Sequence, residues 1–170
     1  NAPSWIALYM GVLMAGGVAV LLNGWWQGAE LAAGIEDVEC TLVLADVQRA
    51  QRLADHGGIG GVRLATFDIA LPIVDALAPL TSLGGGAATA LPDVKGEDLA
   101  TILFTSGSTG KSKGAFSTHR AVVQGTFNYI CQAMMMLALA TEDGLVSATP
   151  PQPTALLTVP LFHVTGEIPI

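Results

Sequence analysis

The sequence predicts an α/β fold in which a partial doubly wound sheet carries flanking helices. Short apolar runs of strand length alternate along the 170 residues with longer segments that have helical periodicity. Hydrophobic residues make up 51% of the chain, which is enough to bury a full core. A glycine-rich stretch interrupts the alternation, so we expect a first α/β block at 1–80, a flexible connection at 81–98 and a second block at 99–170.

The first block opens with a helix and a buried strand. Pro3 suits the start of a helix that covers residues 5–15, and Gly16 and Gly17 end it before a β-branched strand at 18–22. This stretch is uncharged and nearly long enough to span a membrane, but the glycine pair divides it and no basic flank orients it. We therefore expect no transmembrane segment here.

The rest of the first block continues the alternation. Asp46 can cap a helix that extends to about residue 55, because a carboxylate accepts hydrogen bonds from the first free amides. The other expected elements are a helix at 29–38, a strand at 41–45, a turn at 57–61, a strand at 62–65 and a weaker helical piece at 72–80.

The second block begins with an apolar strand at 99–104 that leads into a polar loop. Thr118 then caps a long helix that ends near residue 139, and the three methionines at 134–136 are typical of core filling. A strand at 145–149 and a proline-rich loop at 149–153 follow.

Charge and cysteine content narrow the possible partners. A net charge of −7 with only seven Lys and Arg residues argues against a nucleic-acid partner. Three of these cations, Lys111, Lys113 and Arg120, cluster in or after one loop, which indicates a small anionic ligand. Cys40 and Cys131 lie far apart in apolar segments, so we expect buried, reduced thiols in a cytoplasmic protein and no metal cluster.

That loop, FTSGSTGKSKG at 104–114, has the composition of a phosphate-binding segment. Glycines let backbone amides approach an anion, hydroxyls add donors, and a lysine reaches the outer phosphates. The sequence GKS at 110–112 matches the end of a P-loop. A P-loop would, however, need glycine in place of Thr105 and would place Gly114 in the first turn of its helix, so it fits poorly.

The same loop resembles the [YF]TSG[ST]TGxPKG signature of adenylate-forming, AMP-dependent synthetases and ligases, with Ser112 in place of the usual proline. Residues 15–23, AGGVAVLLN, resemble another family segment, with Leu21 again replacing a proline. Residues 160–166, PLFHVTG, resemble the acyl-pocket motif of acyl-CoA synthetases, and NAPSW at 1–5 resembles the family's NxPEW. The resemblance implies a partial N-terminal AMP-binding domain, 1–170, without the C-terminal domain.

The resemblance also implies roles for individual residues. Lys113 would neutralise the departing pyrophosphate of ATP, and Thr105 would also contact Mg²⁺. Phe162 and His163 would border the carboxylate substrate, with His163 shaping the acyl channel or steadying the carboxylate; a satisfied core histidine is the alternative. The residues that would wrap the β- and γ-phosphates are Thr105, Ser106, Gly107, Ser108, Thr109 and Gly110.

The implied reaction converts a carboxylic acid and ATP to an acyl adenylate and pyrophosphate, after which coenzyme A takes the acyl group. The PLFH block favours an acyl-CoA ligase over a peptide-synthetase module, which usually carries an aspartate near Phe162. Apart from Glu167, no charged residue lies near His163 in the sequence. This scarcity of charge favours a medium- or long-chain fatty acid as the substrate. A degenerate nucleotide-binding module without ligase activity is the alternative, motivated by Ser112 and Leu21. We expect residues 1–170 alone to be inactive, because the family's remaining motifs would lie beyond them.

Overall fold

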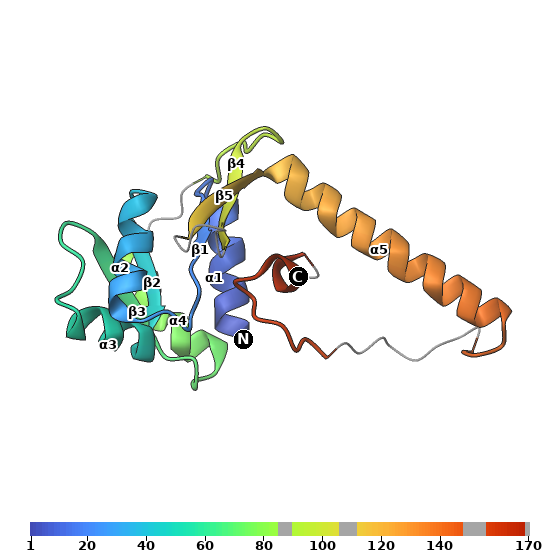
Figure 1. The fold of residues 1–170 in the computed structure, drawn as a ribbon, viewed down its shortest axis with the longest axis horizontal. Helices are drawn as coiled ribbons and strands as arrows, with labels where there is room; N and C mark the ends of the chain where they lie inside the picture. Colours follow the sequence, from blue (N-terminus) through green and yellow to red (C-terminus); the bar gives the residue numbers. More distant parts are fainter. Residues whose placement is uncertain (85–89, 106–111, 148–155, 169–170) are drawn as a thin grey trace.

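The computed structural model describes residues 1–84, 90–105, 112–147 and 156–168 (Figure 1). Within these ranges the elements in chain order are α1 Pro3–Met14, β1 Ala19–Leu21, α2 Gly28–Asp37, β2 Leu42–Asp46, α3 Val47–Asp55, β3 Arg63–Phe67, α4 Ile73–Thr81, the 3₁₀ turn η1 Ser82–Gly84, β4 Leu99–Thr105, β5 Lys113–Thr118, α5 His119–Glu142 and α6 Val164–Glu167.

The strands form two small sheets. One has the order β1-β4-β5, with β1 parallel to β4 through the pair Leu21↔Leu103 and with β5 antiparallel to β4. The other contains β2 and β3, which are parallel, with Leu42 opposite Arg63. The α/β class, the parallel pairing and the flanking helices are confirmed. The described strands nevertheless belong to two separate sheets, and the antiparallel β5 was not predicted.

Helices cover both faces of the β1-β4 pair because successive side chains on a strand point to opposite faces. Leu21 and Leu103 pack on one face with Tyr9 of α1. On the other face, Leu22 and Phe104 lie against α2. The carboxyl ends of β1 and β4 therefore emerge at the same edge, between α1 and α2.

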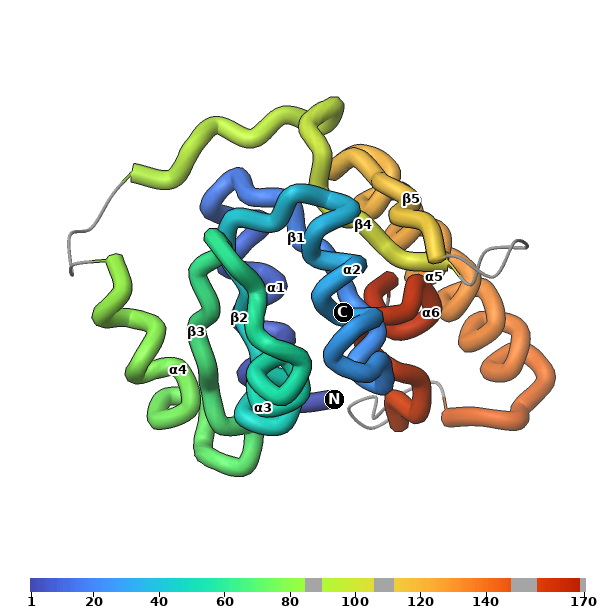
Figure 2. Tube along the Cα trace, turned by 60° about the vertical axis from the view of Figure 1, so that its left-hand side comes forward, coloured from blue at the N-terminus to red at the C-terminus, as the bar shows by residue number. Residues whose placement is uncertain are grey.

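A second core cluster lies among α2, β2 and α3, which stand together in Figure 2. Its buried residues are Leu31, Ile35, Val43, Ala45, Ala50 and Leu53. The helix α4 follows β3 and packs beside both β3 and α1. The α2–β2–α3 part of the first block thus has an apolar cluster of its own, whereas α1 and β1 pack with β4 and the residues after it.

Local signals explain where the helices begin and end. The backbone of Gly16 has a φ of +73°, a conformation that glycine adopts without strain, and it ends α1 as predicted. Asp46 and Thr118 each accept a hydrogen bond from a free amide at the start of the next helix, so both predicted caps are confirmed. The predicted helix, turn and strand at 5–22 are confirmed as well, since α1 has 12 residues and β1 follows it.

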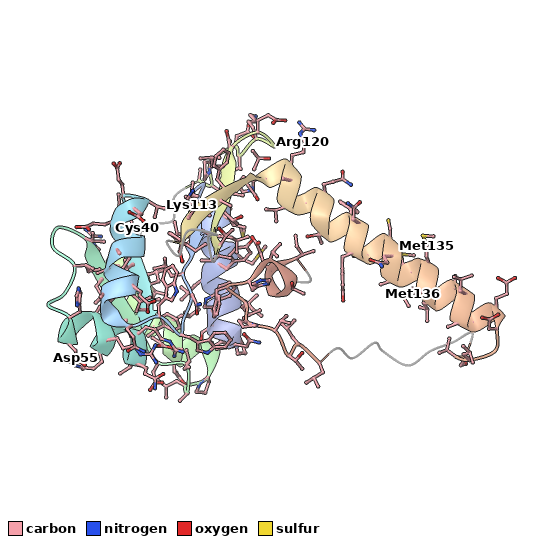
Figure 3. The ribbon with its side chains drawn as sticks, in the orientation of Figure 1. Cys40, Asp55, Lys113, Arg120, Met135 and Met136 are labelled. Atoms are coloured by element: carbon pink, nitrogen blue, oxygen red, sulfur yellow. The ribbon has the colours of Figure 1, made fainter. Side chains whose placement is uncertain are left out.

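The helix α5 extends away from the rest of the chain (Figure 1). None of its described residues is buried, and Met135 and Met136 are exposed along it (Figure 3). The prediction that the methionines at 134–136 fill a core is wrong for this chain, because no described residue covers them. Cys131 is exposed for the same reason, whereas Cys40 is half-buried. The expected strand at 145–149 does not form in its described part, 145–147.

By length and composition, α5 is also the one helix in the described ranges that could cross a membrane. Its mean hydropathy over the best window is 1.2, and it lies far from residues 5–22, where a span was considered and rejected. Core helices of soluble proteins commonly have the same length and composition, so this property does not assign α5 to a membrane.

Candidate functional site

The two described ends of the FTSGSTGKSKG motif lie in paired strands. Antiparallel pairing of β4 with β5 places Phe104 opposite Gly114 and Thr105 opposite Lys113. The Thr105 hydroxyl donates to the Lys113 carbonyl oxygen at 3.4 Å. The predicted ligands between them, Ser106, Gly107, Ser108, Thr109 and Gly110, lie outside the described residues.

The cation at the start of β5 is available to a ligand. Lys113 begins β5, where Figure 3 labels it, and it is exposed. In the described part of the chain, no carboxylate forms an ion pair with the Lys113 ammonium. Exposed Arg120, by contrast, pairs with Glu97 at 2.6 Å. Of Lys113 and Arg120, which lie at the two ends of β5, Lys113 is thus the cation without an ion-pair partner among the described residues.

Aromatic packing fixes the end of β4 against α2. The rings of Trp26 and Phe104 meet edge to face with centroids 5.2 Å apart. A Cβ on Gly34 of α2 would come within 2.9 Å of the Trp26 ring, and one on Gly114 would come within 2.9 Å of the Ile102 side chain. Glycine at both positions therefore permits the close approach that holds the strand end before the loop.

The turn after β1 lies at the same edge and is held by α3. The carbonyl oxygen of Gly24 accepts from Arg49 Nε at 2.9 Å and from Arg52 Nη1 at 3.0 Å. Arg52 Nη1 also donates to the Trp26 carbonyl oxygen at 3.0 Å. Sequence reasoning missed both arginines. Their spacing of three residues, which places them on one side of α3, was the available signal.

The segment at residues 156–168, called here the C-terminal segment, brings the second predicted motif to this edge. Phe162 meets Trp25 of the β1 turn edge to face, with centroids 5.3 Å apart, and packs against the cluster that includes Leu103. The second motif thus lies beside the end of β1, at the same edge of the β1-β4 pair as the first motif, which follows β4. The carboxyl edge of parallel strands is where α/β proteins commonly bind ligands.

His163 caps the short helix α6. Its Nδ1 accepts from the Thr165 backbone amide at 3.3 Å and lies 3.2 Å from the Thr165 hydroxyl. In a neutral imidazole this bond leaves the proton on Nε2, which remains free to donate outward. The side chain is exposed, so the alternative of a core histidine is wrong for the described chain.

A buried polar pair lies behind the motif. The Tyr9 hydroxyl of α1 donates to Glu167 Oε1 at 2.8 Å, and Tyr9 and Glu167 are only 6% and 3% exposed. Burial first, then the hydrogen bond and the negative charge of Glu167, raise the pKa of the Tyr9 hydroxyl far above its usual value. The hydroxyl therefore stays protonated and donates.

A hollow elsewhere does not belong to this edge. It lies between α2 and the turn at 56–62 and is lined in part by Cys40 and His56. Burial raises the pKa of the Cys40 thiol, which disfavours the reactive thiolate. No group of three or more His, Cys, Asp or Glu side chains among the described residues is arranged to hold a metal ion.

The family model described as AMP-binding enzyme matches residues 1–169. The chain belongs to this family. Membership confirms the adenylate-forming resemblance and the fold that it implied. The roles assigned to Thr105, Lys113, Phe162 and His163 stay predictions.

Similar proteins include both ligases and peptide synthetases. The chain is 36% identical over 116 residues to nonribosomal peptide synthetase inpB of Emericella nidulans, covering 67% of this chain and 4% of the relative. It is 27% identical over 170 residues to 4-coumarate–CoA ligase-like 9 of Oryza sativa subsp. japonica, covering 98% and 28%. The crystal structure of ATP-bound MatB from Rhodopseudomonas palustris is 27% identical with a TM-score of 0.69, covering 99% and 30%. The chain thus spans less than a third of each of these relatives.

Proposed function

We propose that the protein containing these residues activates a carboxylic acid with ATP. A carboxylate oxygen of the acid would bond to the α-phosphorus while the bond from that phosphorus to the pyrophosphate oxygen breaks. The products are an acyl adenylate and pyrophosphate. The observation that carries the proposal is exposed Lys113, which pairs with Thr105 across β4 and β5 and has no ion-pair partner among the described residues. The similar MatB structure, which contains ATP, supports it.

The residues present suit a triphosphate and its magnesium ion. Lys113 supplies a point charge, and Thr105 supplies a hydroxyl opposite it in β4. Mg²⁺ commonly keeps several waters and binds through substrate phosphates with few protein ligands. A single hydroxyl from Thr105 is compatible with this mode, because the phosphates and waters supply the other ligands. The described residues hold no cluster of acidic side chains that would bind the ion without the phosphates. The chain's part in the step is to position the phosphates and offset their charge.

For the acid, we propose a substrate without a charged amine, with fatty acids as the first class to test. Phe162 and Trp25 form an edge-to-face aromatic pair at the proposed pocket edge. Glu167, which could have bound an ammonium group, is buried and hydrogen-bonded to Tyr9 instead. An amino acid is the second candidate, because the peptide synthetase inpB is 36% identical over 116 residues.

The sulfur of a thiol would then bond to the acyl carbon while the bond from that carbon to the phosphate oxygen breaks, which releases AMP and leaves the thiol proton to solvent; we propose coenzyme A in the cytoplasm as this thiol. The match of 4-coumarate–CoA ligase-like 9 to 98% of this chain supports a CoA acceptor. His163 would steady the acid carboxylate through the outward Nε2–H that its capping bond leaves free. No nucleophilic side chain is required, because the adenylate itself is the activated species.

The test is carboxylate-dependent exchange of labelled pyrophosphate into ATP, with the full-length natural protein and a panel of fatty, aromatic and amino acids. Exchange isolates the first half-reaction and presumes no acceptor. Lys113→Ala should reduce it by about a hundredfold, the effect of removing one group that stabilises developing charge. Lys95→Ala is the matched control, because Lys95 is exposed and pairs with Asp93 outside β4 and β5. It should leave the rate unchanged.

Each outcome has a definite meaning. Exchange with fatty acids supports the fatty-acid proposal, whereas exchange with amino acids alone favours the peptide-synthetase reading. An unchanged rate in Lys113→Ala refutes the role of Lys113. No exchange with any acid, from a folded protein that binds ATP, would point to a nucleotide-binding module without ligase activity.

A further inference from the structure

The C-terminal segment carries Phe162 and His163 but has little secondary structure of its own. Its regular element, α6, has only four residues. Its position must therefore come from contacts with the rest of the chain. These contacts come from Asn1, from α1, which lies beside the C-terminal segment in Figure 1, from the turn after β1 and from α5.

One tie lies at the start of the chain. The Asn1 side chain donates to the Val159 carbonyl oxygen at 2.8 Å and accepts from the Leu161 amide at 3.0 Å. A second tie reaches α5, where the Thr126 hydroxyl donates to the Ile168 carbonyl oxygen at 3.2 Å. These bonds hold residues 159–161 and Ile168, but they make no side-chain contact with α6, which lies between them.

The Tyr9–Glu167 pair contacts α6 itself, because Glu167 is the last residue of that helix. Glu167 is linked to His163 by one helical turn, because its amide donates to the His163 carbonyl oxygen at 2.9 Å. A rotation of α6 that moved the Glu167 carboxylate away from Tyr9 would therefore also turn His163. The Tyr9 ring is itself fixed, since it stacks on Trp5 with centroids 5.5 Å apart and planes 9° from parallel.

Stability alone does not explain such a pair. A carboxylate buried with a neutral hydroxyl as its described partner is costly to desolvate, and apolar residues of similar size are often at least as stable. What the pair adds is a defined orientation of α6 relative to α1. A hydrogen bond requires a narrow range of donor–acceptor orientations, whereas an apolar contact tolerates many.

We propose that Tyr9 and Glu167 are positioning residues for the acid pocket: their bond sets the rotation of α6, and with it the placement of Phe162 and His163. This inference rests on the proposed function, because the pocket in question is that of the carboxylic acid. Tyr9 and Glu167 do not contact the substrate. They act through the residues that do.

The test compares Tyr9→Phe, Glu167→Gln and the double variant Tyr9→Phe/Glu167→Leu in the full-length protein, by pyrophosphate exchange. Tyr9→Phe should raise the KM for the acid by about tenfold, the value of one hydrogen bond to a charged group, and leave the KM for ATP unchanged. Glu167→Gln keeps an acceptor for the Tyr9 hydroxyl and should retain most of the affinity for the acid. The double variant should fold as well as the wild type yet keep the raised KM for the acid.

Tyr129→Phe is the matched control, because Tyr129 is exposed on α5 and loses the same hydroxyl. It should change neither KM. Equal changes in the KM for acid and for ATP in Tyr9→Phe, or no change in either, would overturn the inference. So would a double variant with the wild-type KM for the acid.

Amide hydrogen exchange separates this inference from the proposed function. In Tyr9→Phe, the amides of residues 161–168 should exchange faster while those of α2 and α3 do not change. If the wild-type protein activates no acid, the proposed function fails, and hydrogen exchange still decides whether the pair positions the C-terminal segment. Unchanged exchange at 161–168 would overturn the inference whatever the activity.

Discussion

Replacing Asp46 with alanine tests how the turn beside the site is held. Asp46 Oδ1 accepts from the Arg49 amide at 2.8 Å, and Oδ2 pairs with Arg49 Nη1 at 2.8 Å. The same guanidinium donates through Nε to the Gly24 carbonyl oxygen. Asp46→Ala would therefore remove the cap of α3, break an ion pair and release the arginine that holds the β1 turn.

The magnitude follows from these losses. A lost helix cap costs about 1 kcal/mol. The ion pair is partly shielded, with side chains 12% and 27% exposed for Asp46 and Arg49, and adds about 0.5–1 kcal/mol. With the weakened bond to Gly24, we expect a loss of about 2 kcal/mol in unfolding free energy, or about 4–8 °C in Tm for a chain of this length.

Asp46→Asn is the discriminating companion, because asparagine caps a helix as well as aspartate does but carries no charge. It should cost only about 0.5–1 kcal/mol, and raising the salt concentration to about 1 M should shrink its difference from the wild type. Urea unfolding followed by far-ultraviolet circular dichroism measures all three chains. The reasoning is refuted if Asp46→Ala stays within about 0.5 kcal/mol of the wild type, or if both variants lose the same amount.

Three further predictions concern the site and the thiols. Gly166→Ala should displace the C-terminal segment, since its Cβ would lie 2.3 Å from the Pro160 carbonyl oxygen, and hydrogen exchange at 161–168 should accelerate. In the 170-residue chain, Cys131 should react with iodoacetamide before Cys40, because Cys131 is exposed whereas burial raises the pKa of Cys40; peptide mass spectrometry measures the order. Ser112→Pro should be tolerated and stabilise the chain by a few tenths to about 1 kcal/mol in urea unfolding, whereas a large loss would show an incompatible backbone.

Elements with strong local signals could be predicted from the sequence. The helix that Asp46 caps was predicted correctly because the short Asp46 side chain accepts a hydrogen bond from the backbone amide of Arg49, only three residues later in the chain. Likewise, α1 ends at Gly16, whose positive φ is a local backbone requirement. Such features depend on neighbours in the sequence, so they are readable before any tertiary contact is known.

The strand β5 could not be predicted in the same way. Its residues KGAFST lack a continuous apolar pattern, and Phe116 within it is 69% exposed. The strand forms because it pairs with β4 across the loop, which is a property of both segments together. The prediction that the methionines of α5 are buried was wrong for a related reason. An apolar sequence indicates that a helix can pack against other residues, but it does not indicate which residues those are.

The candidate site also has parts that the sequence predicted and parts that it did not. The phosphate-loop and PLFH motifs could be recognised because each carries its chemistry within a few consecutive residues. The bonds that place them could not, since Arg49 reaches Gly24 across 25 positions and Tyr9 reaches Glu167 across 158. A change in α1 that touches no ligand should therefore alter how the C-terminal segment meets the acid. If the proposed function holds, substrate preference should depend on α1 as well as on Phe162 and His163.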